Sequence, residues 1–312
     1  MISLVDAHCD TITKLFGSNM DFFDNGCQIS LKKLSGFTAP VQFFAIYLND
    51  GLLDMPFKNT LKIINFYYDQ VNKYYKYIDT VSYATDILEF SLDNKIASVL
   101  ALEGGEALEG KISNLEIFYE LGIRCITLTH NKRNKLGDGV SVVNGGGLTD
   151  FGLNVVKRMN YMDMIVDVSH LNQEGFWDVA KAAKKPFIAS HSNSYAICPH
   201  KRNLTDDQLK AIKNSGGVVG INLYPPFVKS GSAAFEDLLP HITHMVDLIG
   251  PGHVGLGCDF DGIDEAVGGI SDVCGLSKLY DMLLPEFGKQ IADGIFSGNF
   301  LRLLDGALPK KN

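Results

Sequence analysis

Short apolar segments rich in β-branched residues recur along the chain, and stretches with apolar residues at helical spacing separate most of them. Residues 57–78 show the helical pattern, because apolar side chains return there every three or four positions, at Leu61, Ile64, Tyr68, Val71, Tyr75 and Ile78. The apolar segments predict eight strands, at about residues 2–7, 40–48, 96–102, 123–129, 164–169, 186–190, 217–223 and 253–258. Strand and helix alternating in this way predict an α/β fold, the parallel (β/α)8 TIM barrel.

Two regions hold more than a simple barrel requires. The interval 49–95 contains two helical stretches, and the tail 274–305 adds further C-terminal helices. Thr205 and Gln208 have the spacing of a capping box at a helix start, and Gly216 can end that helix before the next strand. No linker or change of composition divides the chain, so we expect residues 1–312 to form one domain.

A glycine-rich patch lies in a long loop, about residues 131–148, after the fourth predicted strand. It reads Asn-Gly-Gly-Gly at 144–147 and lacks the spacing of a phosphate loop or a dinucleotide-binding fingerprint. The sequence leaves two interpretations open, a mobile loop beside a site and a plain surface turn.

Composition narrows the classes of partner and the compartment. The net charge is −8 and no dense run of Lys or Arg occurs, which argues against a nucleic-acid partner. The chain shows no basic start followed by an apolar stretch and no apolar run of membrane-spanning length, so we expect neither a secretory signal nor a membrane partner. The six cysteines are scattered without a C-x-x-C pair, which is typical of reduced thiols in a cytoplasmic protein.

Polar residues that can bind a metal close several of the predicted strands. Alternate residues of a strand share a face, so His8 and Asp10 point the same way. The carboxyl ends of barrel strands meet at one rim, where barrel enzymes carry their chemistry. Four of the eight histidines fall at such ends, which favours a site for a divalent metal such as zinc. The residues at these ends are His8, Asp10, Glu103, His130, His170, His191, Asp259 and Asp261.

Each of these residues taken singly has an ordinary explanation. A histidine at a strand end can be a buried, hydrogen-bonded residue, and Glu103 can stand at a helix start, where the dipole favours a carboxylate. Asp259 and Asp261 can cap turns. Their joint occurrence at one rim favours the metal site. The chain contains neither zinc-finger spacing, nor an H-E-x-x-H helix, nor a G-x-S-x-G serine elbow.

Taken in order, these motifs resemble the zinc dipeptidases of the membrane (renal) dipeptidase family, peptidase family M19. The resemblance runs nearly from end to end. It rests on Asp-Ala-His-Cys-Asp at 6–10, Leu-Glu-Gly-Gly at 102–105, Leu-Thr-His-Asn at 128–131, Gly-Leu-Thr at 147–149 with Phe-Gly at 151–152, Asp-Val-Ser-His at 167–170, Ser-His-Ser at 190–192, Arg-Asn-Leu at 202–204 with Asp-Asp at 206–207, Gly-Cys-Asp-Phe-Asp-Gly at 257–262, and Gly-Asn-Phe-Leu-Arg at 298–302.

The resemblance implies a dipeptidase with two zinc ions per subunit. His8 and Asp10 would hold one ion, and His170 and His191 would hold the other. Glu103 would bridge the two, and a hydroxide shared by the metals would attack the peptide bond of a dipeptide.

The resemblance also implies residues that act on the substrate. His130 would contact the scissile carbonyl and the developing oxyanion. Arg202 would bind the terminal carboxylate of the substrate, and Asp259 would transfer protons. Tyr224, at the end of the seventh predicted strand, is a candidate liner of the substrate pocket, with a barrel-core tyrosine as the alternative.

The chain departs from the animal cell-surface members of this family, which carry a signal peptide, a lipid-anchor signal and disulfides. It therefore resembles a soluble bacterial-type member, and a homodimer is expected by resemblance only. A D-residue at the second position of the dipeptide is a hypothesis. Two other functions stay open: another metal-dependent hydrolase on the same barrel, such as a lactonase, deaminase or cyclic-amide hydrolase, and a metal-binding barrel that no longer catalyses.

Overall fold

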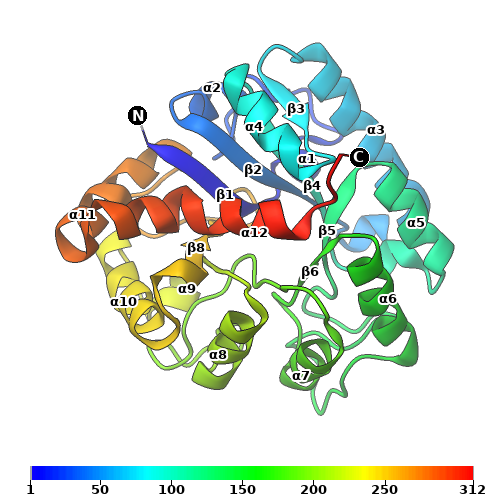
Figure 1. Cartoon of the computed structure of the whole chain (residues 1–312). Helices are drawn as coiled ribbons and strands as arrows, with labels where there is room; N and C mark the ends of the chain where they lie inside the picture. The colour runs from blue at the N-terminus through cyan, green and yellow to red at the C-terminus, as the bar shows by residue number, and fades with distance from the viewer. Residues whose placement is uncertain (1, 312) are drawn as a thin grey trace.

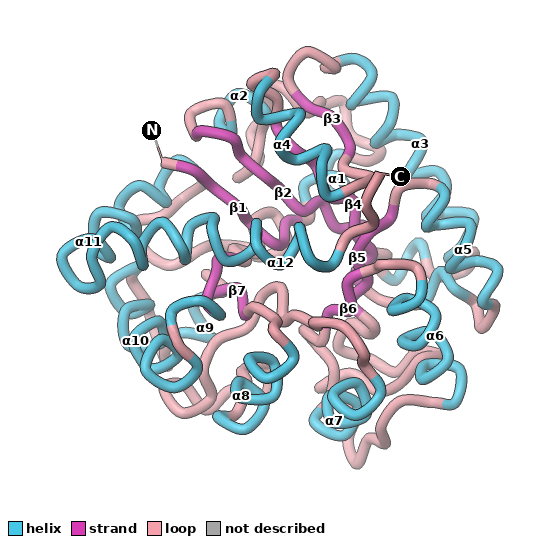
Figure 2. Tube along the Cα trace, in the orientation of Figure 1, coloured by secondary structure: helices cyan, strands magenta, loops and turns pink. Residues whose placement is uncertain are grey.

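A curved parallel sheet forms the centre of the molecule, and helices surround it (Figures 1 and 2). The computed structural model describes residues 2–311. The strands follow the spatial order β6-β5-β4-β2-β1-β8-β7, and β3 pairs with β4 beside this path. Their bounds are β1 Ser3–Cys9, β2 Thr38–Tyr47, β3 Ile78–Thr80, β4 Ile96–Glu103, β5 Ile123–Thr127, β6 Ile165–Asp167, β7 Val219–Ile221 and β8 Val254–Leu256.

The sixth predicted strand, residues 186–190, takes its place in the barrel without becoming a regular strand. Parallel bridges join Ile188 to Asp167 of β6 and Ala189 to Val219 of β7. This segment therefore lies between β6 and β7 and closes the circle of parallel strands. The predicted (β/α)8 barrel fold is confirmed.

The helix predicted from residues 57–78 is shorter than expected, and that prediction was wrong at its end. Helix α3 spans Pro56–Lys73, and Tyr74 caps it. Tyr75 lies outside the helix with 58% of its surface exposed, and Ile78 begins the unpredicted strand β3. A single buried isoleucine satisfies both the helical and the strand period, so the apolar pattern could not place this boundary.

Up to β8, the other helices lie in the connections between successive strands around the barrel, and α11 and α12 follow the last strand (Figure 1). The predicted capping box at Thr205 and Gln208 is present at the start of α8, and Gly216 ends this helix with a φ of +85°. No helix within residues 2–311 is both long enough and apolar enough to cross a lipid bilayer. The helices are α1 Thr11–Leu15, α2 Leu31–Leu34, α3 Pro56–Lys73, α4 Ala84–Leu92, α5 Ile112–Glu120, α6 Asp150–Tyr161, α7 Gln173–Ala182, α8 Asp206–Ser215, α9 Pro225–Val228, α10 Leu238–Ile249, α11 Leu276–Asp293 and α12 Asn299–Ala307.

The extra C-terminal helices predicted from the sequence are α11 and α12. Helix α12 lies across one end of the barrel (Figure 1), where Phe300, Leu303 and Leu304 pack with the inward side chains of the strands. Those partners include Val5 and Val41 near the starts of their strands. Burying a side chain such as Phe or Leu contributes roughly 1.5–3 kcal/mol. Helix α12 thus fills the amino end of the barrel with apolar side chains, and the polar chemistry is left to the other end.

All six cysteines are free thiols, as predicted, and only Cys274 is exposed. A backbone hydrogen bond anchors the loop at 131–148, since the amide of Val140 donates to the carbonyl oxygen of His170 across 2.9 Å. The carboxylate of Asp138 accepts from the amide of Gly146 at 2.7 Å and pairs with Arg133. The glycine-rich patch is thereby fixed next to the end of β6.

Candidate metal centre and substrate cleft

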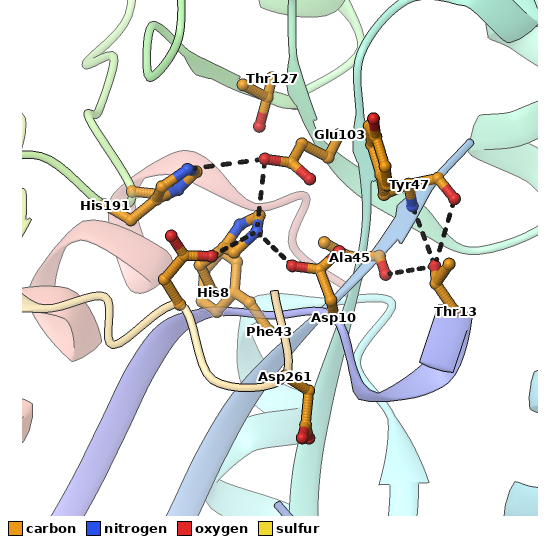
Figure 3. A network of polar contacts seen from close by, with 12 residues as sticks. His8, Asp10, Thr13, Phe43, Ala45, Tyr47, Glu103, Thr127, His191 and Asp261 are labelled. Atoms are coloured by element: carbon orange, nitrogen blue, oxygen red, sulfur yellow. Dashed lines mark hydrogen bonds and ion pairs between the residues drawn. The ribbon is translucent and has the colours of Figure 1, made fainter. Parts of the chain in front are cut away.

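Five buried residues from four barrel strands converge at the carboxyl end of the barrel, and two of them, His8 and Asp10, come from the end of β1. Oε1 of Glu103, at the end of β4, lies 3.0 Å from Nε2 of His170, 3.6 Å from Nε2 of His8 and 3.6 Å from Nε2 of His191. Figure 3 shows His8, Asp10, Glu103 and His191 pointing toward one another. Two groups of ligand atoms result, and both include Glu103: His8 with Asp10, and His170 with His191.

The first group lies at the junction of β1 and α1. Nε2 of His8 is 3.3 Å from Oδ2 of Asp10. Asp10 precedes helix α1, but its side chain makes no capping hydrogen bond. Nε2 of His8 and Oδ1 of Asp10 are buried and have no hydrogen-bond partner among residues 2–311. Buried polar atoms without partners are costly, so this group has the unsatisfied atoms that a cation would bind.

In the second group the outer ring nitrogens determine which inner nitrogens are free. Nδ1 of His170 lies 2.9 Å from the side-chain oxygen of Asn131, which accepts a hydrogen bond from the ring N–H. Nδ1 of His191 lies 2.7 Å from Oγ of Ser190, and this hydroxyl in turn donates to Asp167 at 2.5 Å. Both rings therefore present an unprotonated Nε2, and these two atoms are 2.8 Å apart. Two lone pairs facing each other repel, and a cation between them and Glu103 removes that repulsion.

Close backbone packing brings the rings of the two groups together. A Cβ at Gly257 would stand 1.6 Å from the backbone oxygen of Ser190, so only glycine allows this approach. The next residue, His191, lies against His8 with ring centroids 3.9 Å apart. A Cβ at Gly262 would similarly stand 2.2 Å from Oδ2 of Asp10. The glycines of the 257–262 motif therefore permit the close spacing of the site.

The electrostatics of the cluster also fit a cation. Burial raises the pKa of Glu103 well above its ordinary value, as does the neighbouring Asp10 carboxylate. Burial disfavours the charged form of His8, but Glu103, Asp10 and Asp259 outweigh it and raise its pKa to about 10. Burial lowers the pKa of both His170 and His191 well below the ordinary value. Imidazole nitrogens and carboxylate oxygens are ordinary zinc ligands, so the residues present fit zinc.

Asp259 follows β8 and lies at the edge of the cluster. Its Oδ1 is 3.9 Å from Nε2 of His8, and its Oδ2 accepts a hydrogen bond from the side chain of Asn222 at 2.9 Å. Burial raises its pKa to about 6. Asp259 also forms a third ligand-like group with His8 and His191. Its carboxyl group can therefore contact a metal or exchange a proton near neutral pH.

Three rim residues have left-handed backbones that side chains other than glycine rarely adopt. The φ angles are +65° at His170, +63° at Asp259 and +67° at Asp261. Asp261 is not aimed at the cluster (Figure 3). It accepts from Oγ1 of Thr11 at 2.6 Å and from the amide of Gln28 at 2.8 Å, and so ties the loop after β8 to α1 and the segment before α2. Such strained residues persist where surrounding contacts hold them, often at functional sites.

His130 stands over the cluster as a neutral imidazole. Its ring centroid is 4.4 Å from that of His170 and 4.6 Å from that of Tyr47. Burial, with a smaller effect of the Arg202 charge, lowers its pKa to about 4. His130 and Tyr47 line a cavity of about 770 Å³ that also contains Asp10, Glu103 and Asp259. A neutral ring at neutral pH keeps one N–H to donate toward a substrate oxygen.

Arg202 is buried beside the second ligand group, with 4% of its surface exposed. Its Nη2 donates to the backbone oxygen of His191 at 3.1 Å and its Nη1 to Oγ of Ser192 at 3.4 Å. Its Nε has no hydrogen-bond partner in the described part of the chain, and the guanidinium carbon lies 5.3 Å from the Phe227 ring centroid. Burial lowers its pKa to about 10, so it stays charged at neutral pH. A buried cation with an unused donor calls for an anionic ligand.

The sequence-predicted residues thus converge with two exceptions, Asp261, which points away from the cluster, and Tyr224. Tyr224 caps α9 and packs edge-on against Phe227, with ring centroids 4.9 Å apart. It lines a neighbouring cavity, and only Asp264 is shared between that cavity and the one over the cluster. Sequence reasoning missed Tyr47, Asn222 and the supporting residues Asn131, Asp167 and Ser190. The last three belong to the motifs at 128–131, 167–170 and 190–192, which was the available signal.

A parallel barrel that collects imidazoles and carboxylates at the carboxyl rim defines the class of metal-dependent hydrolases. Within that class, the chain belongs to the membrane dipeptidase family, peptidase family M19, whose sequence profile matches residues 1–310. It is therefore a dipeptidase of the metallopeptidase type.

Relatives of the chain agree with this assignment. An uncharacterised dipeptidase of Schizosaccharomyces pombe is 34% identical over 306 residues, covering 90% of this chain and 73% of that protein. The dipeptidase aclJ of Aspergillus oryzae is 32% identical over 293 residues, covering 89% and 69%. A metallopeptidase from Rhodobacter sphaeroides, solved with a phosphinate mimic of the dipeptide L-Ala-D-Ala, superposes with a TM-score of 0.91 at 26% identity and covers 98% and 99% of the two chains.

Proposed function

We propose that this chain is a dinuclear zinc dipeptidase that hydrolyses the single peptide bond of dipeptides. The observation that carries the proposal is that Glu103 belongs to both ligand groups, so its carboxylate could serve two ions. His8 and Asp10 would hold one ion, and His170 and His191 the other. Bound zinc would polarise the peptide carbonyl and lower the pKa of a water molecule.

The side chains around the ligands supply the remaining chemistry. Arg202 binds the terminal carboxylate and orients the substrate. His130 donates a hydrogen bond to the carbonyl oxygen as negative charge develops on it, a contribution of about 2.7–4 kcal/mol for one such donor. Asp259 accepts a proton from the attacking water and returns it to the leaving amine, so the proton balance closes within one turnover.

The position of Arg202 supports a preference for dipeptides over longer peptides. Its guanidinium bonds the backbone oxygen of His191, whose ring belongs to the ligand cluster. The carboxylate clamp thus lies next to the metal ligands, which leaves room for one residue between the cleaved bond and the carboxylate. A longer peptide would place an amide, without the negative charge, opposite this buried cation.

The test is hydrolysis of L-Ala-D-Ala, L-Ala-L-Ala and tri-alanine by protein carrying two zinc ions, with a chelated sample as control. We expect cleavage of dipeptides only, and its loss on chelation. The likeness to the Rhodobacter sphaeroides enzyme supports acceptance of a D-residue at the second position, and a strict L,L preference would refute that part. No cleavage of any peptide by the zinc-loaded protein would redirect the search to lactones and cyclic amides. The homodimer and the cytoplasmic location stay predictions.

A further inference from the structure

A second cavity, of about 380 Å³, adjoins the ligand cluster on the side of Arg202. His170 lines both this cavity and the larger one over the cluster. Arg202 forms part of its wall, and the buried side chains of Leu171 and Leu204 and the partly buried side chain of Val140 contribute apolar surface. A substrate held by its terminal carboxylate at Arg202 therefore has the side chain of its last residue next to this cavity.

The charged residues that line this cavity are all cations. They are Lys201 and Arg202, and no Asp or Glu lines it within residues 2–311. Nζ of Lys201 donates to Oγ of Ser141 at 2.9 Å, and no carboxylate of the described chain lies within 4.0 Å of it. The two carboxylates that follow Thr205 in the chain pair with other side chains, Asp206 with His244 at 2.8 Å and Asp207 with Lys210 at 3.5 Å. Lys201 thus carries a charge without an ionic partner.

Two helices add positive potential to the same cavity. Asn172 caps the start of α7 and Thr205 caps the start of α8, and both residues line the cavity. The amino end of a helix carries a partial positive charge that favours anions. Arg202 is taken up by the substrate's terminal carboxylate, so Lys201 and the two helix starts are the groups that favour a second negative charge in this cavity.

We infer that this cavity receives the side chain of the substrate's carboxy-terminal residue, and that it selects an acidic side chain, Asp or Glu. The methylene groups would lie on Val140, Leu171 and Leu204, and the side-chain carboxylate would meet Lys201. The inference rests on the proposed dipeptidase function and names its preferred substrate class.

The test compares dipeptides that differ only in charge. The substrates given to the zinc-loaded protein are L-Ala-Glu and L-Ala-Gln, each with the last residue in the L and in the D form, and L-Ala-Ala as the reference. We expect kcat/KM for the acidic member of each cleaved pair to exceed that of its amide by about tenfold. Lys201→Met should bring this ratio near one and leave L-Ala-Ala within about twofold, and Lys201→Glu should reverse the ratio.

Lys210→Met is the matched control, because Lys210 is an exposed lysine on α8 that pairs with Asp207 and does not line the cavity. It should keep the ratio of the unaltered protein. A ratio near one in that protein, or a ratio that Lys201→Met leaves unchanged, would overturn the inference while dipeptidase activity remained. Inactivity toward every dipeptide by protein with two zinc ions would instead overturn the proposed function, and the inference with it.

Discussion

The side-chain nitrogen of Asn222 donates a hydrogen bond to Oδ2 of Asp259 across 2.9 Å. Asn222 is itself held in place, since its amide donates to the side-chain oxygen of Asn193 at 3.0 Å and its carbonyl accepts from Asn193 at 2.9 Å. The segment that carries Asn193 also carries the candidate ligand His191 and leads to Arg202. One buried pair of asparagines thus connects the carboxylate proposed to move protons with the segment proposed to bind the substrate.

Replacing Asn222 with Ala removes the donor that fixes one oxygen of Asp259. We expect kcat to fall about tenfold or more while KM changes little, because substrate binding at Arg202 is untouched. Steady-state kinetics with measured zinc content checks this. Asn65→Ala, on the exposed face of α3, is the control that should behave like the unaltered protein. An unchanged kcat would show that Asp259 keeps its working geometry without Asn222.

Ser190 should control zinc affinity through His191. Its hydroxyl oxygen accepts a hydrogen bond from Nδ1–H of His191. Without this acceptor, in Ser190→Ala, the ring proton can instead occupy Nε2, the nitrogen proposed to bind the metal. We expect zinc affinity at this site to fall about 10- to 100-fold. Competition with a chromophoric chelator measures the affinity, and Ser215→Ala, whose hydroxyl bonds Ile212 at the end of α8, is the control. Equal affinities in the two variants would refute this role.

Arg202 should act on binding more than on the chemical step. We expect Arg202→Met to raise KM about 10- to 100-fold, because charge-assisted hydrogen bonds to the substrate carboxylate are lost. The kcat should stay within a few-fold of that of the unaltered protein. With the unaltered protein, a dipeptide whose terminal carboxylate is amidated should show a similar rise in KM. With Arg202→Met, the amidated and free dipeptides should have the same KM. Arg202→Lys covers the case in which the methionine variant fails to fold. Additive losses from the amide and the substitution would place the carboxylate elsewhere.

Metal removal should destabilise the protein, because the buried carboxylates and lone pairs of the cluster lose their counter-charge. At a zinc concentration about 1,000 times the dissociation constant, binding adds ~4 kcal/mol to the free energy of unfolding. We expect chelation to lower Tm by about 5 °C or more, as measured by differential scanning calorimetry. Glu103→Gln should show a much smaller shift, since it weakens both ligand groups. An equal shift in that variant would point to zinc bound elsewhere.

Stability at acid pH should depend on Asp21, outside the metal cluster. The hydrogen bond from Tyr74 at 2.6 Å, with help from Lys73 and despite partial burial, lowers its pKa to about 2 from an ordinary 3.8. A lowered folded-state pKa contributes stability above the unfolded value, and this contribution is lost as the pH falls from 3.8 through 2. Asp21→Asn should therefore flatten the acid-side loss of stability in urea titrations. Asp24→Asn, at an exposed pair with Lys32, should not.

The order of strands and helices could be read from the chain, because periodicity is written in neighbouring residues. Seven of the predicted strands became regular strands, and the segment at 186–190 joined the barrel through single bridges. The strand at 78–80 was missed because its one apolar residue, Ile78, continued a helical pattern. Element boundaries depend on local competition that an apolar count does not resolve.

The sequence by itself determined which residues stand at the rim, since ligand types at strand ends are visible in the motifs and a parallel barrel gathers those ends on one side. Only the tertiary structure decided their distances and environments. Glu103 became the shared member of two groups, and Tyr224 came to lie in a neighbouring cavity. Asn222 became a candidate positioning residue because it contacts Asp259, and Lys201 became a candidate specificity residue because it lines a cavity. Such relations join residues far apart in the chain, and barrel closure and loop packing set them, which no local pattern encodes.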